Sequence, residues 1–308
     1  MHTIRVDHLT KRYGSHLALD NVTFDAKPGR VTGFLGRNGA GKTTTLRILV
    51  GLSAATSGSA TIGGVAYHDI LEPARHIGAL VDGAGFHPGS PARTQLLLLA
   101  RSIGVSPYRV DEVLRVTDLA HAGTKRTGKL SLGMRQRLTL AAVLLADPAV
   151  LILDEPANGL DPQGLRWLRT LLRSLAAEGR TVLISSHQLN EVALIADDVV
   201  VVHGGQVVKA GTVAELSNDR VYVRTPDAAD LAAAMRLGGH ETHVEDESLW
   251  VSGATTEQVG DAAAVLGVAI HELRMETSSL EDLFFDSIDH RAPAAKPAPF
   301  NFSRGWAA

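Results

Sequence analysis

The chain has no cysteine among its 308 residues, so disulfide bonds, thiolate metal sites and cysteine nucleophiles are excluded. Long apolar runs are missing too. The longest candidate, residues 138–146, contains Thr139 and ends before Asp147, well short of the ~18–20 apolar residues that a membrane-spanning helix needs. Residues 1–14 lack the apolar core of a signal peptide. A reducing compartment is compatible with this composition, and any membrane role is expected to come through a partner.

A strong net charge is also missing. The formal charge of −3 argues against a protein that binds nucleic acid over its whole surface. Charge is nevertheless uneven, because residues 91–146 carry nine Lys and Arg against three acids, and residues 220–290 carry four Arg against fourteen acids. Two solvated faces of opposite sign are the simpler interpretation. The alternative is that the basic segment faces a partner or lipid headgroups.

What the sequence does contain is a phosphate-binding pattern, G-x-x-x-x-G-K-[ST], at residues 36–44. A predicted strand precedes it and a predicted helix follows it. Its glycines permit a tight turn whose backbone N–H groups face one point, and the helix adds the positive end of its dipole. Lys42 is predicted to reach the β- and γ-phosphates, and the hydroxyl of Thr43 to ligate Mg²⁺. For the motif alone, a glycine-rich turn without a ligand is the alternative. The residues predicted to bind nucleotide here are Gly36, Arg37, Asn38, Gly39, Ala40, Gly41, Lys42, Thr43 and Thr44.

Two acids follow a second buried strand, predicted at residues 150–153. The carboxyl end of a parallel strand places Asp154 and Glu155 at the ligand edge of the sheet. Asp154 is predicted to hold Mg²⁺ through its water shell, and Glu155 to orient and deprotonate an attacking water. Solvated acids at a strand end are the alternative.

Two further polar residues are more ambiguous. His187 follows the next predicted strand and could bond the γ-phosphate or hold the water, although a lone histidine is more often structural. Asp161 lies in the sequence NGLDP, where ordinary turn chemistry explains it equally well.

Strands that alternate with helices predict an α/β protein with a mainly parallel, doubly covered sheet. A small α+β unit follows residue 216, and the Pro-Ala spacing of residues 291–308 predicts a disordered tail. The predicted domains are therefore residues 1–216, 217–290 and 291–308. Predicted strands are 3–6, 17–24, 31–35, 76–81, 150–153, 181–185, 199–203, 206–209, 220–224, 249–251 and 268–273. Predicted helices are 44–50, 95–102, 109–117, 134–145, 165–177, 189–196, 227–237, 256–266 and 280–288, and residues 56–64 are predicted to be loop and hairpin.

Taken in order, these motifs resemble the ATP-binding subunits of ABC transporters. Residues 36–44 match the Walker A loop and residues 150–155 match Walker B. LSLGM at residues 130–134 matches the signature sequence, which P-loop proteins of other classes lack. The matches of single residues are Asp161 in the D-loop, His187 as the switch histidine and Tyr13 as the aromatic that stacks on adenine. The resemblance covers residues 3 to about 216.

The resemblance implies a P-loop NTPase of ABC type, with an N-terminal antiparallel β region, a RecA-like core and a helical subdomain at about residues 91–146. It implies two subunits, a homodimer or a heterodimer with a similar ATPase, that sandwich two ATP molecules with Mg²⁺. Ser131 and Gly133 would then complete the γ-phosphate site of the partner. The output would pass to a separate integral membrane permease and not to nucleic acid. The implied location is the cytoplasmic face of the cell membrane.

Two departures from the family pattern narrow the resemblance. Leu132 and Met134 stand where the signature usually has Gly and Gln, and Asp82 takes a loop position usually held by Gln. A carboxylate at residue 82 could still ligate Mg²⁺ through water. Both departures resemble the branch of bacitracin, lantibiotic and drug exporters, which implies efflux of a drug, an antibiotic or a peptide.

Other readings of the same motifs stay open. ABC ATPases that act on ribosomes usually carry two ATPase domains, whereas this sequence shows one. Those that repair DNA carry a long coiled coil between the two Walker motifs, whereas about a hundred residues without sustained heptads separate these motifs here. A regulator that barely hydrolyses ATP is disfavoured, because Glu155 and His187 fill both hydrolytic positions. The C-terminal unit could stabilise a dimer, contact the membrane subunit or sense a ligand. His240 and His243 there are more simply solvated than metal-bound.

Overall fold

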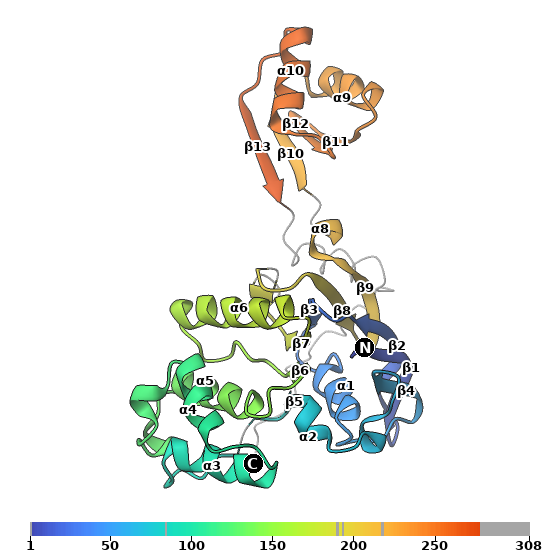
Figure 1. Cartoon of the computed structure of the whole chain (residues 1–308). Coiled ribbons are helices and arrows are strands. Elements are labelled where there is room, and N and C mark those ends of the chain that lie inside the picture. Colours follow the sequence, from blue (N-terminus) through green and yellow to red (C-terminus); the bar gives the residue numbers. More distant parts are fainter. Residues whose placement is uncertain (1, 84, 189–190, 193, 217–218, 278–308) are drawn as a thin grey trace, which may run out of the picture.

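A computed structural model of the chain describes residues 2–83, 85–188, 191–192, 194–216 and 219–277. A large body contains the elements up to α8 (Val213–Leu216), and a smaller unit stands beyond it (Figure 1). No helix among the described residues is both long and apolar enough to cross a membrane.

A three-stranded antiparallel sheet forms one layer of the large body. Its order is β2 (His16–Ala26), β1 (Ile4–Tyr13) and β4 (Ser57–Ile62). Alternate residues of β1 and β2 are buried, as a sheet with one covered face requires. Of the loop and hairpin predicted at residues 56–64, the loop is wrong over β4, whereas an antiparallel bridge between Ile62 and Val65 confirms a hairpin turn at its end. The Ser- and Gly-rich sequence of β4 conceals a strand because backbone pairing with β1, rather than apolar burial, specifies it.

The central sheet has six strands, in the order β5 (Ile77–Leu80), β6 (Val150–Leu153), β7 (Thr181–Ser186), β3 (Val31–Leu35), β8 (Asp198–His203) and β9 (Gln206–Thr212). The first five are parallel, and β9 returns antiparallel to β8. Strands β3, β6 and β7 are buried along their whole length, as strands covered on both faces are. The predicted parallel α/β sheet is confirmed.

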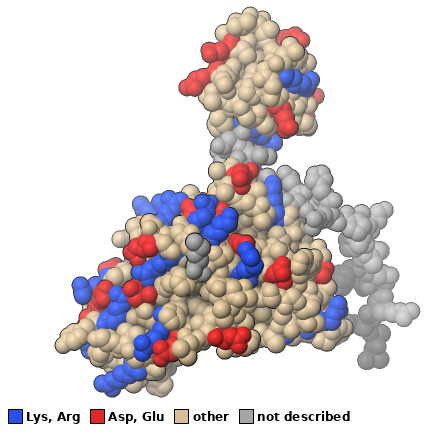
Figure 2. All heavy atoms as spheres, turned by 45° about the vertical axis from the view of Figure 1, so that its right-hand side comes forward, with Lys and Arg blue, Asp and Glu red and all other residues tan. Residues whose placement is uncertain are grey.

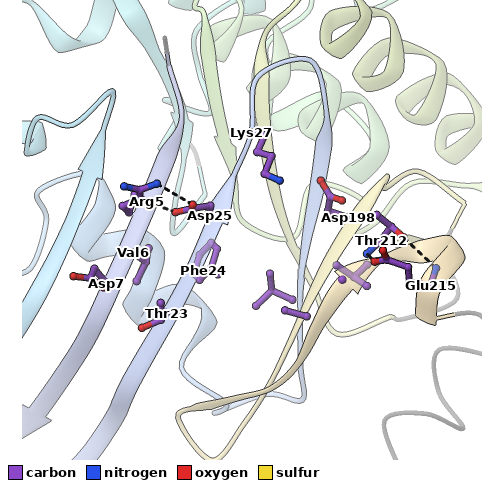
Figure 3. A pocket seen from close by; sticks show the side chains of 14 residues that line it. Arg5, Val6, Asp7, Thr23, Phe24, Asp25, Lys27, Asp198, Thr212 and Glu215 are labelled. Atoms are coloured by element: carbon purple, nitrogen blue, oxygen red, sulfur yellow. Dashed lines mark hydrogen bonds and ion pairs between the residues drawn. The ribbon is translucent and has the colours of Figure 1, made fainter.

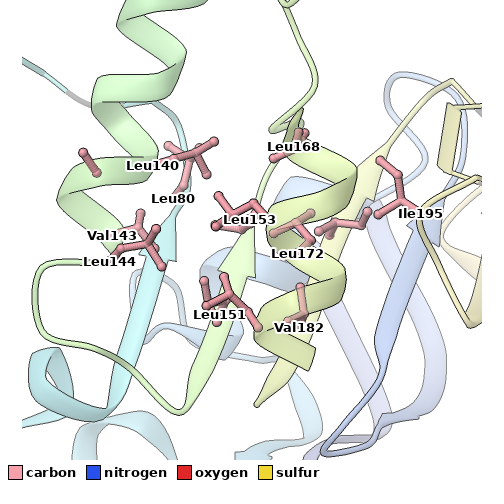
Figure 4. Packing of buried hydrophobic residues seen from close by; sticks show 14 of the residues in the cluster. Leu80, Leu140, Val143, Leu144, Leu151, Leu153, Leu168, Leu172, Val182 and Ile195 are labelled. Atoms are coloured by element: carbon pink, nitrogen blue, oxygen red, sulfur yellow. The ribbon is translucent and has the colours of Figure 1, made fainter. Parts of the chain in front are cut away.

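Two apolar layers cover the two faces of the central sheet. On one face, Leu151, Leu153 and Val182 pack with residues of α6 (Pro162–Ala177) and α5 (Leu132–Val143), as Figure 4 shows. On the other face, Phe34 and Ile152 pack with α1 (Lys42–Leu49) and the antiparallel sheet. The carboxyl ends of β3, β6 and β7 are thereby fixed side by side, with loops free to carry polar groups.

A helical segment lies between β5 and β6. It contains α3 (Ala92–Ser102), α4 (Tyr108–Val116) and α5, each beginning within three residues of its predicted start. Their buried apolar residues, among them Leu96, Val113 and Leu138, join the core. The sequence did not predict α2 (Pro73–His76) or three short 3-10 helices, η1 (Tyr67–Asp69), η2 (Ala120–Ala122) and η3 (Thr127–Lys129).

The small C-terminal unit alternates strands and helices. Its elements are β10 (Asp219–Arg224), α9 (Ala228–Leu237), β11 (Glu241–Glu245), β12 (Ser248–Ser252), α10 (Thr256–Leu266) and β13 (Glu272–Thr277). The antiparallel sheet has the order β11-β12-β10-β13, and apolar residues of both helices pack against its strands. Figure 2 shows acidic side chains on the surface of this unit.

The structure departs from the sequence prediction at two strands of the C-terminal unit. The third strand predicted for this unit exists, but its predicted bounds, residues 268–273, are four residues too early, because β13 spans Glu272–Thr277 and the preceding residues lead out of α10. Strand β11 was missed because Val244 is its one strongly apolar residue. The predictions for residues 280–288 and 291–308 lie outside the described residues. So does part of the helix predicted at residues 189–196.

Candidate functional site

The turn between β3 and α1 is built so that only glycine fits at two of its positions. Gly41 has φ 104°, and a Cβ there would lie 2.5 Å from Leu19 Cδ2. A Cβ on Gly36 would lie 2.4 Å from the carbonyl oxygen of Val202. The backbone therefore makes a tight turn directly before α1, the arrangement in which backbone N–H groups and a helix N-terminus bind anions.

Lys42, the first residue of α1, places a buried ammonium group inside this turn. Its side chain is only 6% exposed, and Nζ donates to the carbonyl oxygen of Gly36 at 2.7 Å. Oε1 of Glu155 lies 3.3 Å from the same nitrogen. A buried charge needs such partners, and these two are anionic or strongly polar, as phosphate oxygens are.

Asp154 follows β6 and accepts hydrogen bonds on both of its carboxylate oxygens. The hydroxyl of Thr43 donates to Oδ2 at 2.8 Å, and the hydroxyl of Ser185 donates to Oδ1. Ser185 also accepts from the backbone N–H of Glu155 at 3.0 Å. Ser185 was not singled out from the sequence. Its position at the end of β7, which neighbours β6, is the signal that could have found it.

The donors around Asp154 fit a magnesium ion. A hydroxyl and a carboxylate oxygen from Thr43 and Asp154 lie next to each other, and oxygen ligands of this kind are those that Mg²⁺ prefers. Among the described residues, no group of three or more His, Asp or Glu side chains could hold a metal alone.

Glu155 and His187 lie in direct contact. Nδ1 of His187 is 2.8 Å from Oε2 of Glu155, whose side chain is only 20% exposed. Glu155 has φ 49°, in the left-handed region, which costs a non-glycine residue on the order of 1–3 kcal/mol. The chain bends here so that one carboxylate contacts both the ammonium of Lys42 and the imidazole of His187.

A cavity of about 340 Å³ adjoins these groups. Tyr13 at the end of β1 lies at its rim, 46% exposed, and Nζ of Lys11 lies 4.7 Å from the centre of the Tyr13 ring. His16 also lines the cavity and was not predicted. The other lining residues are Ala18, Asn38, Gly39, Gly41, Lys42, Thr43, Thr44 and Glu155.

The signature residues line a different cavity, of about 470 Å³. Ser131 caps α5 by accepting from the N–H of Met134 at 3.2 Å, and Asp161 caps α6 by accepting from the N–H of Gly164 at 2.8 Å. Gly133 lies in the first turn of α5. Within one chain, the structure thus brings Lys42, Thr43, Asp154, Glu155 and His187 together and leaves Ser131, Gly133 and Asp161 apart from them.

Asp82, after β5, contacts an arginine. Both of its carboxylate oxygens accept from Arg47 of α1, each at 2.8 Å. This hydrogen bonding raises the pKa of the Arg47 guanidinium above its ordinary value. Metal binding by Asp82 remains a prediction, and Arg47 is a residue that sequence reasoning missed because α1 gave no sign of its partner.

A larger cavity, of about 540 Å³, lies between β1, β2, β8 and β9 (Figure 3). It is charged, but Arg5 pairs with Asp25 within it, and Glu215 accepts from the backbone N–H of Thr212. It holds none of the residues predicted to bind nucleotide. The cavity beside Lys42 is therefore the candidate site.

The fold and this geometry define a P-loop ATPase, since a phosphate turn, paired acids and a histidine share one edge of a parallel sheet. Residues 19–158 match the ABC transporter family, and residues 219–281 match a domain of unknown function. The chain is 38% identical to the bacitracin transport ATP-binding protein BcrA of Bacillus licheniformis, across 91% of this chain and 95% of that protein. It is 34% identical to the Nod factor export ATP-binding protein I of Burkholderia orbicola (strain AU 1054), across 79% and 83%.

A solved ATP-binding subunit of an ABC transporter superposes with a TM-score of 0.63 and 28% identity, over 69% of this chain and 91% of that one. The chain therefore belongs to the family of ABC transporter ATP-binding proteins, and it is an ATPase. The expected fold, with its antiparallel and parallel sheets, is confirmed.

Proposed function

We propose that this chain is the ATP-hydrolysing subunit of an exporter, in which two copies close around two ATP molecules and a separate permease carries the substrate. The contact of Glu155 with both Lys42 and His187 carries the proposal, because it joins a phosphate-binding cation to a base. The relatives named for bacitracin transport and Nod factor export support the direction of transport. Efflux of an antibiotic, a drug or a peptide is the proposed role.

Phosphate binding would use the turn at residues 36–44. The backbone N–H groups would cradle the β- and γ-phosphates, and their oxygens would replace the Gly36 carbonyl and the Glu155 carboxylate as partners of Lys42. Thr43 and Asp154 would hold Mg²⁺, which offsets phosphate charge when it is bound. The ring of Tyr13 would stack on adenine, a contact worth roughly 1–3 kcal/mol.

Hydrolysis would begin once the Glu155 carboxylate is released from Lys42. Glu155 would take a proton from the attacking water, and general-base catalysis of this kind is worth ~10²–10⁴-fold. His187, held against Oε2, would keep the carboxylate aimed while Oε1 faces the water. Ser185 would fix the backbone of Glu155 and one oxygen of Asp154.

A second copy would complete the site. The cavity lined by Ser131, Gly133 and Asp161 lacks a phosphate turn of its own, while the Lys42 cavity lacks the signature residues. Head-to-tail pairing would bring the two half-sites together twice. The homodimer is the simplest arrangement, and a heterodimer with a similar ATPase would have the same geometry.

The permease contact is proposed at the helical segment. Tyr108 is 87% exposed and Leu98 is 55% exposed. Leu99, next to Leu98 in α3, lines a cavity of about 300 Å³ together with Leu80 of β5, Val81 after it and Val143 of α5. An exposed apolar surface beside such a hollow suits a segment of a partner protein. The subunit would then lie on the cytoplasmic face of the cell membrane, bound through this partner.

Affinity purification from detergent-solubilised membranes tests this function. The wild-type chain should recover an integral membrane protein, and a Leu98→Asp, Tyr108→Asp variant should lose it. Leu266→Asp, at an exposed apolar position on α10, is the matched control and should retain it. Recovery of ribosomes or DNA without any integral membrane protein would overturn the exporter and favour a soluble ABC ATPase.

A further inference from the structure

The four-stranded sheet of the C-terminal unit has one face that its own helices do not use. Val221, Val223, Leu249 and Val251 are buried on the helix side, so their neighbours in sequence point the other way. We call the opposite surface the outer sheet face. Its residues are Glu241, His243 and Glu245 on β11, Ser248, Trp250 and Ser252 on β12, Arg220, Tyr222 and Arg224 on β10, and Glu272, Arg274 and Glu276 on β13.

Aromatic rings occupy the middle of the outer sheet face. The ring of Trp250 lies 5.4 Å from that of Tyr222 and 5.7 Å from that of His243. Arg220 lies 5.6 Å from the Trp250 ring. Trp, Tyr and Arg are the residues most enriched at the energetic centres of protein interfaces. The outer sheet face therefore has the composition of a contact surface.

Residues of opposite charge lie on the two sides of this aromatic centre, at matching positions along the strands. Strand β12 pairs with β11 on one side and with β10 on the other. Glu241 and Arg220 both pair with Ser252, whereas Glu245 and Arg224 both pair with Ser248. The acidic row, Glu241 and Glu245 of β11, thus lies opposite the basic row, Arg220 and Arg224 of β10, across β12.

Neither charged row is fully ion-paired within the described part of the chain. Among the described residues, Glu241 and Glu245 have no ion-pair partner. Arg274 contacts Glu272 at 2.7 Å and Glu276 at 2.9 Å. The basic row shares these two carboxylates at longer distances, with Arg220 3.4 Å from Glu276 and Arg224 3.9 Å from Glu272. Both rows therefore retain capacity for an external partner.

We propose that the outer sheet face binds the same face of a second copy of this chain, with the twofold axis along β12. A rotation of 180° about this axis keeps the position of each residue along the strands and exchanges the two sides of β12. Strand β11 of one copy therefore covers β10 of the other. Glu241 then meets Arg220, Glu245 meets Arg224, and the two Trp250 rings meet on the axis. A twofold axis across the strands would instead stack β11 on β11 and oppose like charges.

This contact goes beyond the ATP-driven closure proposed above, because no nucleotide takes part in it. It would keep two copies together while their ATP sites open and exchange nucleotide. The contact is independent of the proposed hydrolysis mechanism, so an experiment can contradict either proposal without contradicting the other.

Two charge-reversed variants of the full chain test the pairing, without nucleotide, by analytical ultracentrifugation. The first is Glu241→Arg with Glu245→Arg, and the second is Arg220→Glu with Arg224→Glu. Each variant alone opposes like charges and should self-associate more than about tenfold more weakly than wild type. An equimolar mixture restores every pair, so mixed dimers should form with near wild-type affinity. Asp230→Arg with Asp261→Arg, exposed on the two helices, is a matched control that should not weaken association.

The mixture also shows that both variants are folded, because misfolded chains would not associate again. Trp250→Ala should weaken self-association roughly thirtyfold, since it removes the central contact. A monomeric wild-type chain without nucleotide, variants that associate as wild type does, or a mixture that stays monomeric would each overturn the proposal. Lys42→Ala should leave this association unchanged, which separates it from failure of the ATP site.

Discussion

Lys42 shows how one residue ties the sequence motif to the physical site. Its buried ammonium contacts the Gly36 carbonyl and the Glu155 carboxylate, and phosphate oxygens would replace both. Lys42→Ala should therefore weaken ATP binding by roughly tenfold to a hundredfold, the loss of about 1.5–3 kcal/mol for hydrogen bonds to a charged group. Titration with a fluorescent ATP analogue measures this, with exposed Lys27→Ala as the control. Equal affinities for Lys42→Ala and wild type would contradict the assigned role.

Glu155 gives the matching prediction for catalysis. Glu155→Gln keeps the size and polarity of the side chain but removes its basicity. Nucleotide affinity should be retained, while turnover should fall ~10²–10⁴-fold. Steady-state phosphate release with Glu178→Gln as the surface control measures the effect. Hydrolysis at the wild-type rate would show that another group is the base.

Residues inside local motifs were predictable, and residues that act across strands were not. The spacing of residues 36–44 was enough to place Lys42 and Thr43, and an apolar run placed Asp154 at a strand end. Ser185 and Arg47 carry no motif. Ser185 reaches Asp154 because β7 neighbours β6, and Arg47 meets Asp82 because α1 passes the end of β5, so both need the fold to be known.

At the scale of elements, the Arg47–Asp82 pair joins α1 to the loop after β5. Both side chains are more than 40% exposed, so solvent screens the pair and its effect on stability is small. Arg47→Met should release Asp82 toward the metal and lower the Mg²⁺ concentration needed for half-maximal ATPase activity. Asp82→Asn should raise it, and exposed Arg101→Met should leave it unchanged. Identical Mg²⁺ dependence in all four proteins would remove Asp82 from the metal site.

A second element-scale prediction concerns pH and the joint between α3 and α4. Hydrogen bonds from Arg93, at 2.8 and 2.9 Å, hold the pKa of Asp111 below its ordinary value of 3.8. A lowered pKa in the folded state stabilises the protein at pH above the unfolded value, and the gain disappears as the pH falls through the folded value. Asp111→Asn should thus lower the free energy of unfolding at pH 7, by less than about 1 kcal/mol because the pair is exposed. Urea unfolding at pH 7 and near pH 3 measures this, and an equal loss at both would contradict it.

Elements were predictable where burial imposes a pattern. Strands β3 and β6 are wholly buried, and their predicted bounds are confirmed. Strands β4 and β11 lie at sheet edges and carry Ser, Thr, Glu and His, so their sequences resemble loops. Backbone pairing with a neighbour decides them, and a single sequence does not display that pairing.

At the scale of the whole molecule, the central claim is that one chain carries two halves of different ATP sites. The test is retention of labelled ATP in the Glu155→Gln background, where hydrolysis cannot empty the site. After dilution into unlabelled ATP, Glu155→Gln should hold its nucleotide, whereas Glu155→Gln with Gly133→Asp should bind equally well at first and then release it. Adding Ser102→Asp instead, at an exposed end of α3, should change nothing. Retention that survives Gly133→Asp would contradict a site shared between two copies.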